Sequence, residues 1–434
     1  MGIVAEVRMW GRTIGAVSIG DGEEIANFEY DSAFAQSGIE ISPLHMPLSN
    51  RIYRFPQLSR QTFHGLPGLL ADVLPDRFGN ALIDAWLTLQ GRSGDDFNAV
   101  ERLCYTGSRG MGALEFVPVI GVADKQSSRI EIDKLVDLAS KVLVSRGDLQ
   151  VNFNASDKSQ VLHDILQVGT SAGGARAKAI IAWNPQTSEV RSGQVKAAQG
   201  FEYWLLKFDG VSGNRDKELA DPQGYGAVEY AYYQMARDCG IEISESRLLE
   251  ENGRRHFMTK RFDRLDSGEK MHMQSLGALA HYDFNLAGAY SYEQSLQVMR
   301  QLGLPMASIE QQFMRMVFNV IARNQDDHVK NIAFLMNKKG EWSLSPAYDL
   351  TYSYNPDGLW TGVHQMSLNG KRDRFSRDDF KACAQSVSMK RGVADEILTR
   401  VRDVVSRWKV YADDAGVPSG IEEKIARSIR LEIF

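Results

Sequence analysis

The chain has 434 residues, of which 43% are hydrophobic and 24% are charged, and these proportions are typical of a folded globular protein. Its net charge of -5 gives no general electrostatic reason to expect nucleic acid or an anionic membrane as a direct partner. No apolar run approaches the roughly 20 residues of a membrane span and no signal-peptide pattern opens the chain, so we expect a cytoplasmic protein with no membrane partner.

The first 120 residues predict a small sheet followed by helices. Residues 4–10, 14–19 and 24–30 are rich in β-branched and aromatic side chains and are separated by glycine-containing turns, which is typical of a series of hairpins. Beyond residue 68 the apolar side chains recur at helical spacing, and Pro75 predicts a break between two helices. The three cysteines of the chain lie far apart without a C-x-x-C spacing, which argues against a disulfide frame or a zinc site.

Candidate helices at 130–145 and 157–167 lead to a glycine-rich loop. Gly173 and Gly174 permit positive φ angles and let backbone N–H groups approach a phosphate, while Arg176 and Lys178 supply cationic donors. A strand pattern at 179–183, a turn and a second strand follow the loop. This order predicts a lobe that covers a nucleotide, with Ala175 as part of the loop.

Lys207 ends an apolar strand pattern at 203–208 and could reach nucleotide phosphates. The alternative is a lysine that only extends its charged end from a strand into water. Glu229 begins the next helical pattern and could pair with Lys207, as protein kinases pair a strand lysine with a helix glutamate.

The chain then changes from β to α. Strand patterns at 246–250 and 255–262 are followed by helical patterns at 274–281, 291–302 and 308–323, and further helices are expected to start near Arg377, Asp395 and Ile421. Lys260 and Phe262 fall at this change, where an adenine would lie between two lobes, so both are candidate nucleotide contacts.

The stretch after the 308–323 pattern carries the residues for phosphoryl transfer. Asp326 stands five positions before Asn331, and Asp349 follows a predicted strand-turn-strand at 332–344. Protein kinases have their catalytic Asp, a metal-binding Asn and a second metal-binding Asp in this order. The sequence therefore predicts Asp326 as a base and Asn331 and Asp349 as Mg²⁺ ligands, with His328 and Lys330 beside the nucleotide.

A solvated loop is the alternative for this polar stretch. The preceding helical pattern is strongly apolar on one face, so it should pack against a core and hold the loop rigidly, which a surface loop would not need. The predicted fold is α+β and kinase-like with two lobes: an N-terminal β-rich subdomain at 1–120, a nucleotide-binding lobe at 121–262 and a helical catalytic lobe at 263–434.

Several ordered motifs together resemble the HipA family of toxin kinases, the toxin half of bacterial HipBA toxin-antitoxin pairs. The match depends on Ser-x-Gly-Gly-Ala-Arg-x-Lys at 171–178, Lys207, Lys-Arg-Phe-Asp-Arg at 260–264, Asp-Asp-His-x-Lys-Asn at 326–331 and Pro-x-Tyr-Asp-Leu at 346–350. The chain departs from the pattern at Ala177, where many relatives have Pro, and at Lys260, where some have Glu.

The resemblance implies roles for single residues. It assigns Asp326 as the catalytic base, Asn331 and Asp349 as Mg²⁺ ligands and Lys207 as a contact of the ATP phosphates. Ser171 matches the family's autophosphorylated serine, whose modification ejects the glycine loop and inactivates the kinase.

The resemblance also implies partners. It predicts a protein substrate phosphorylated on serine, with an aminoacyl-tRNA synthetase as the best-known type, and a small helix-turn-helix antitoxin similar to HipB that mediates most contact with DNA. Two alternatives remain from the residues alone. One is a small-molecule kinase of the aminoglycoside or choline type, and the other is a catalytically inactive co-repressor that binds an antitoxin on DNA.

Overall fold

The computed structural model describes residues 2–94, 97–120, 130–144, 176–194, 196–211, 215–216, 219–220, 223–265 and 267–433. The expected helix at 157–167 and the loop residues Ser171, Gly173, Gly174 and Ala175 lie outside these ranges. In the described part no helix is long and apolar enough to cross a bilayer. The three cysteines are buried and unpaired by disulfides.

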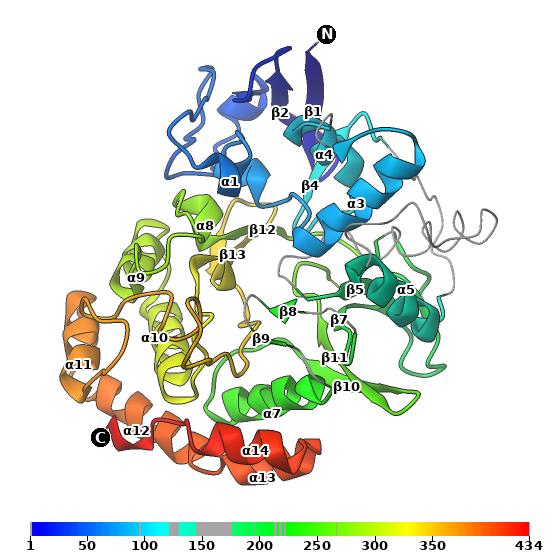
Figure 1. Cartoon of the computed structure of the whole chain (residues 1–434). Helices are drawn as coiled ribbons and strands as arrows, with labels where there is room; N and C mark the ends of the chain where they lie inside the picture. The colour runs from blue at the N-terminus through cyan, green and yellow to red at the C-terminus, as the bar shows by residue number, and fades with distance from the viewer. Residues whose placement is uncertain are drawn as a thin grey trace.

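An antiparallel sheet of order β3-β2-β1-β4 forms the N-terminal end of the molecule (Figure 1). Its strands are β1 (Ile3–Met9), β2 (Arg12–Ile19), β3 (Asn27–Tyr30) and β4 (Leu114–Val117). Trp10 and Gly11 join β1 to β2 with φ angles of 52° and 77°, the two positive values that a tight hairpin turn requires. The predicted hairpin series is confirmed, but β3 starts later than expected because Ala26 donates its N–H to Gly65 instead of pairing with β2.

Helices follow the first hairpins. They are α1 (Arg60–Phe63), α2 (Gly68–Ala71), α3 (Arg77–Leu89) and α4 (Ala99–Thr106). Of these, α2 and α3 were predicted on either side of Pro75. Pro75 separates α2 from α3, and Asp76 caps α3 by accepting the N–H of Gly79 at 2.6 Å. The apolar face of α3 belongs to the core of the second sheet rather than to that of the first.

The second sheet has the order β10-β11-β7-β5-β6. Its strands are β5 (Lys178–Trp183), β6 (Val190–Ser192), β7 (Glu202–Lys207), β10 (Ser246–Glu251) and β11 (Arg254–Lys260). Helices α3 and α5 (Ile132–Val144) pack in its apolar core, and α7 (Tyr225–Asp238) contacts β10 and β11. A separate pair of short strands, β8 (Arg215–Asp216) and β9 (Leu219–Ala220), follows β7.

The C-terminal half is mainly helical and has the largest apolar core. Its elements are the sheet strands β12 (His272–Ser275), β13 (Ala333–Met336) and β14 (Trp342–Leu344) and the helices α8 (Leu276–Leu279), α9 (Tyr292–Gln301), α10 (Met306–Ile321), α11 (Arg377–Ser386), α12 (Val393–Val405), α13 (Trp408–Ala415) and α14 (Ser419–Ala426). The helix predicted at 274–281 is wrong at its start, because His272–Ser275 pairs with β13 as a strand. Helix α8 begins only after Ser275, whose hydroxyl accepts the N–H of Ala278.

His281 lies between the N-terminal helices and the C-terminal half. Its ring stacks on His45 at 4.2 Å and its Nε2 accepts the N–H of Gly68 at 3.1 Å. Burial, reinforced by the neighbouring His45, lowers the pKa of His281 to about 3. The neutral imidazole is therefore the form that fits this junction.

We expect this histidine to make the fold sensitive to acid. Below the unfolded pKa near 6.5 the unfolded chain binds the proton that the folded chain refuses, so stability falls from about pH 6.5 towards pH 3, by at most about 1.4 kcal/mol per pH unit. His281→Asn should reduce the loss of stability between pH 7.5 and 5.5 in urea denaturation, because asparagine tolerates the φ of 55° and cannot titrate. His64→Asn is the comparison, because His64 has a similar φ and a more exposed side chain, and burial lowers its pKa less. Its effect should have the same sign and be smaller; an equal effect of both variants would contradict the assignment.

Candidate active site

Helix α10 delivers the polar loop at 324–331. Ile309, Phe313 and Val317 are fully buried on the helix, which fixes it in the C-terminal core. The helix ends at Ile321, and Arg323 reverses the chain with a φ of 59°. The loop that follows is therefore held at a rigid base, as the sequence predicts.

Lys207 lies at the centre of a buried ion-pair cluster. Its Nζ is 2.5 Å from Oε1 of Glu229 and 2.5 Å from Oδ1 of Asp349, and Nη1 of Arg176 lies 3.3 Å from Oε2 of Glu229. Burial disfavours the charge on Lys207, but the carboxylates of Asp349 and Glu229 outweigh burial and raise its pKa. The predicted pairing of Lys207 with Glu229 is confirmed.

Asp349 is held in an unusual backbone conformation beside this cluster. Its φ is 52°, a left-handed value that aspartate tolerates better than most residues. Its carbonyl accepts the side-chain N–H of Asn324 at 3.2 Å. Burial tends to raise the pKa of Asp349, yet the neighbouring Lys207 lowers it overall, so the carboxylate is ionised.

Asp326 and Asn331 meet within their own loop. The side-chain N–H of Asn331 donates to the carbonyl of Asp326 at 2.9 Å, which turns the amide oxygen of Asn331 away from that carbonyl. Oδ1 of Asp326 accepts the indole N–H of Trp360 at 2.6 Å and lies 3.8 Å from Nε2 of His328. The predicted strand-turn-strand after this loop is confirmed as β13 and β14.

The neighbouring Asp327 anchors the loop, a role that the sequence alone did not indicate. Its buried carboxylate accepts hydrogen bonds from Tyr292 Oη at 2.5 Å, from the N–H of Gln365 at 2.7 Å and from Nδ1 of His364 at 2.8 Å. Arg430 can only donate to Nε2 of His364, 3.3 Å away, so the proton of the neutral imidazole lies on Nδ1 and points at Asp327. Although burial opposes ionisation, these donors lower the pKa of Asp327.

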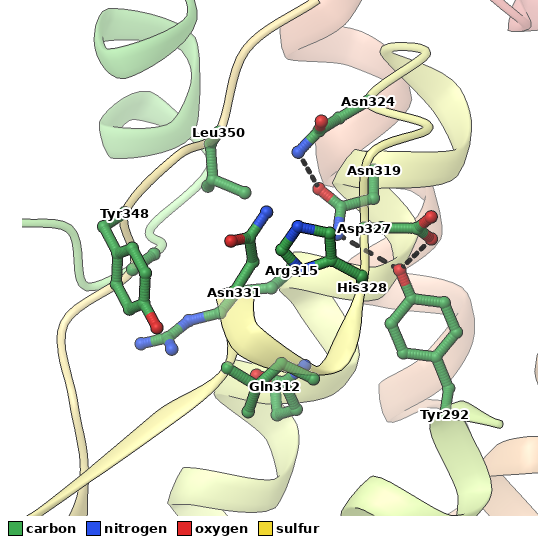
Figure 2. A pocket seen from close by; sticks show the side chains of 12 residues that line it. Tyr292, Gln312, Arg315, Asn319, Asn324, Asp327, His328, Asn331, Tyr348 and Leu350 are labelled. Atoms are coloured by element: carbon green, nitrogen blue, oxygen red, sulfur yellow. Dashed lines mark hydrogen bonds between the residues drawn. The ribbon is translucent and has the colours of Figure 1, made fainter. Parts of the chain in front are cut away.

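A polar pocket behind the loop extends this network (Figure 2). The Asn324 side chain donates to Oδ1 of Asn319 at 2.9 Å, and Asn319 donates to Tyr292 Oη at 3.1 Å. Through Tyr292 the bonds continue to Asp327, and through Asn324 they reach the carbonyl of Asp349. The backbone of Asp349 and the loop at 324–331 are therefore joined by one chain of hydrogen bonds.

Tyr292→Phe should weaken the fold by about 2 kcal/mol, because the variant removes a buried donor to a charged group. Burial and the charge of Asp327 raise the pKa of Tyr292 well above its usual value, so the hydroxyl remains a donor throughout the accessible pH range. Urea denaturation measures the change. Tyr411→Phe removes a similar 2.7 Å bond to the more exposed Asp238 and should cost less; the reverse order would show that Asp327 is not the anchor.

Two further predicted nucleotide contacts, Lys178 and Lys330, have carboxylate partners in the protein. Lys178 faces Lys207 across the sheet, and its Nζ lies 2.9 Å from Oδ2 of Asp76. Lys330 lies 3.8 Å from Asp72. The chain thus places carboxylates of the N-terminal helices beside two lysines of the predicted cleft.

Lys260 and Phe262 lie further along β11 and beyond it. On β11, Lys260 lies three residues after Phe257, the residue that pairs with Lys207. Its Nζ is 3.2 Å from Oε1 of Glu202. The ring of Phe262 lies 5.6 Å from that of Tyr348, next to Asp349. Phe262 therefore borders the Asp349 segment, while Lys260 occupies the sheet end.

A metal ion at this centre would need ligands besides carboxylates of the protein. Within the described ranges, no three His, Cys, Asp or Glu side chains gather closely enough to hold an ion. Asp349 and the amide oxygen of Asn331 are the two oxygen donors that the motif supplies. This set suits Mg²⁺, which commonly takes one or two carboxylates and completes its shell with water and phosphate oxygens.

Comparison with known proteins identifies related sequences over most of the chain. Residues 170–408 match the HipA-like C-terminal domain and residues 5–117 match the HipA N-terminal domain. A putative kinase, Y4dM, of Sinorhizobium fredii is 25% identical over 221 residues, which cover 46% of this chain and 52% of the relative. A putative kinase of Haemophilus influenzae is 27% identical over 134 residues, covering 28% of this chain and 39% of the relative. The chain thus spans about half or less of these relatives.

A solved structure matches nearly the whole chain. It is the HipA toxin of Shewanella oneidensis MR-1 in a complex with HipB and operator DNA, with a TM-score of 0.67 and 16% identity over 98% of this chain and 96% of that chain. At this identity the likeness shows the fold. The predicted α+β, kinase-like fold is confirmed.

Proposed function

This chain belongs to the HipA family, and from that membership we propose that it is an ATP-dependent serine/threonine protein kinase acting as the toxin of a bacterial toxin-antitoxin pair. The observation that carries the proposal is the cluster in which Lys207 joins Glu229 to Asp349. In protein kinases a strand lysine paired with a helix glutamate contacts the phosphates, and an aspartate beyond the catalytic loop binds the metal.

In the proposed site Asn331 and Asp349 would hold Mg²⁺, which neutralises negative charge on the ATP phosphates when bound. Lys207 would then exchange its contact with Asp349 for a phosphate oxygen while keeping Glu229. Asp326 would orient the hydroxyl of the acceptor and accept its proton. The hydrogen bonds that reach Asp327 and the Asp349 carbonyl keep these groups in fixed relative positions.

We assign the remaining nucleotide contacts to Gly173, Gly174, Ala175, Arg176 and Lys178 of the glycine loop and to Lys260, Phe262, His328 and Lys330 around the cleft. Arg176 and Lys178 pair with Glu229 and Asp76, so a phosphate would compete with these carboxylates for them. Ser171 is the proposed site of autophosphorylation. A phosphate on this serine would add about -1.5 to -2 charge, and we propose that repulsion by the acidic metal site then favours release of the loop.

The proposed partners are a HipB-like helix-turn-helix antitoxin, through which the protein would contact DNA, and a protein substrate such as an aminoacyl-tRNA synthetase. The structural neighbour supports the first because it was solved with HipB and operator DNA. A small-molecule kinase of the aminoglycoside or choline type would use the same transfer residues, and an inactive co-repressor would use none of them.

Mass spectrometry tests the proposal. Phosphatase-treated wild type and Asp326→Asn are incubated with Mg-ATP, and the intact mass and the phosphopeptides are measured. We expect one phosphate on the Ser171 peptide of the wild type alone. Asp357→Asn, an exposed carboxyl change in a neighbouring loop, is the control and should behave as wild type.

Phosphate on an aminoglycoside or choline instead of on protein would favour the small-molecule kinase. ATP turnover that survives both Asp326→Asn and Asp349→Ala would contradict both kinase assignments.

A further inference from the structure

The segment at 360–365 is bound to three consecutive residues of the catalytic loop. The indole N–H of Trp360 donates to Oδ1 of Asp326 at 2.6 Å. The backbone N–H of Gln365 donates to Asp327 at 2.7 Å, and its side-chain N–H lies 3.4 Å from the carbonyl of Gln325. His364 adds the bond to Asp327 described above. The segment is thus fixed against the loop independently of the indole ring.

Because the backbone and Gln365 already fix the segment, the indole is not needed to attach it. The side chain of Gln365 also donates to the carbonyl of Trp360, which sets the main chain at that residue. The Trp360 side chain is itself half-buried, and the preceding Leu359 is 96% exposed, so this part of the segment lies outside the buried core. The hydrogen bond from the indole N–H therefore serves to orient the Asp326 carboxylate and not to attach the segment.

We propose that Trp360 is a positioning residue for phosphoryl transfer, whose indole N–H holds Oδ1 of Asp326 and so orients the carboxylate towards the hydroxyl of the acceptor. This inference rests on the proposed kinase function. In the step, the acceptor oxygen forms a bond to the γ-phosphorus, and the bond from that phosphorus to the bridging β,γ-oxygen breaks. The electron pair of the broken bond leaves with ADP, and the hydroxyl proton passes to the carboxylate of Asp326.

The chemistry of the donor suits this role. An indole N–H can only donate and an ionised carboxylate can only accept, so the two groups can bond in one way. The bond therefore fixes the orientation of the carboxylate. The indole is also neutral, so it orients the carboxylate without giving it a full positive partner, unlike Lys207 beside Asp349.

Nuclear magnetic resonance tests the contact without any assay of activity. The chain has 7 tryptophans, whose indole N–H signals can be labelled with ¹⁵N, and the Trp360 signal is the one missing in Trp360→Phe. In Asp326→Asn we expect that signal to move upfield, because the charged acceptor is lost. The Trp342 signal, whose N–H donates to the backbone carbonyl of Glu40 at 3.1 Å, should stay in place. An unmoved Trp360 signal would overturn the proposal.

Kinetics test the consequence. Trp360→Phe should lower the rate of phosphate transfer to the chain itself roughly tenfold to a hundredfold at unchanged ATP affinity, the effect of losing one hydrogen bond to a charged group. The loss should fall on kcat while KM for ATP stays as in wild type, a split that a general loosening of the site would not produce. Full transfer in Trp360→Phe, with Asp326→Asn inactive, would refute the positioning role alone. Transfer that survives in Asp326→Asn would refute the proposed function instead.

Discussion

Asp349→Asn is expected to weaken Mg²⁺-dependent ATP binding by more than about 100-fold, because even outer-shell partners of a metal contribute about 10–100-fold to its affinity. Asparagine also populates the left-handed conformation that Asp349 adopts at a φ of 52°, so the backbone should be kept. Lys207 retains Glu229 as its partner. The loss of ATP affinity should therefore result from the missing metal ligand and not from a rearranged site.

Calorimetric titration of ATP with and without Mg²⁺ measures this effect. Asp326→Asn is the matched comparison, since it makes the same chemical change at the proposed base and should leave the affinity nearly as in wild type. Equal affinities of the two variants in Mg²⁺ would remove Asp349 from the proposed metal site.

Glu229→Gln is expected to lower the free energy of unfolding by about 3 kcal/mol, since removing one partner of a buried ion pair leaves an uncompensated charge. Glu229 accepts from both Arg176 and Lys207, and its side chain is only 2% exposed. Lys207 would keep Asp349, which holds the loss near the lower end of the usual range. The same change would bind Lys207 more tightly to Asp349 and so compete with the metal.

Urea denaturation measures the change in stability, and Glu202→Gln is its control on the same sheet. That carboxylate pairs with Lys260 at 3.2 Å and is 28% exposed, so its loss should cost less than about 1 kcal/mol. Similar losses in the two variants would show that the Glu229 cluster does not stabilise the fold.

The arrangements that the sequence could predict are those that depend on local spacing. Asp326 and Asn331 lie in one short loop, and the β13–β14 hairpin follows directly, so their order along the chain is also their order in space. The partner of Lys207 was predictable because a strand lysine and the following helix glutamate form a recurrent pair.

The contacts that the sequence could not predict join distant parts of the chain. Trp360 and Tyr292 reach Asp326 and Asp327 from separate segments, and no periodicity or spacing marks a single tryptophan or tyrosine as a partner of a carboxylate. The same limit explains the incorrect helix start at 274. The pairing of His272–Ser275 with β13 is a tertiary interaction that overrides local preference.

For Lys178 the sequence predicted part of the arrangement but not its ion-pair partner. The residue type of Lys178 was enough to suggest a phosphate donor, but the carboxylate of Asp76 comes from a helix of the N-terminal part. Burial raises the pKa of Asp76 although Lys178 acts against it, so a carboxylate of the N-terminal part sits in an unfavourable environment beside the cleft. Such a contact depends on how the two parts of the chain pack, which local sequence does not encode.

The hydrogen-bond chain from Asp349 through Asn324, Asn319 and Tyr292 to Asp327 has a consequence for the evolution of this protein. Each member satisfies its neighbour in a buried setting, so a substitution at one position leaves a polar group without its partner at the next. Descendants of a common ancestor should therefore inherit these positions as a block, and a change at one should be followed by a compensating change beside it.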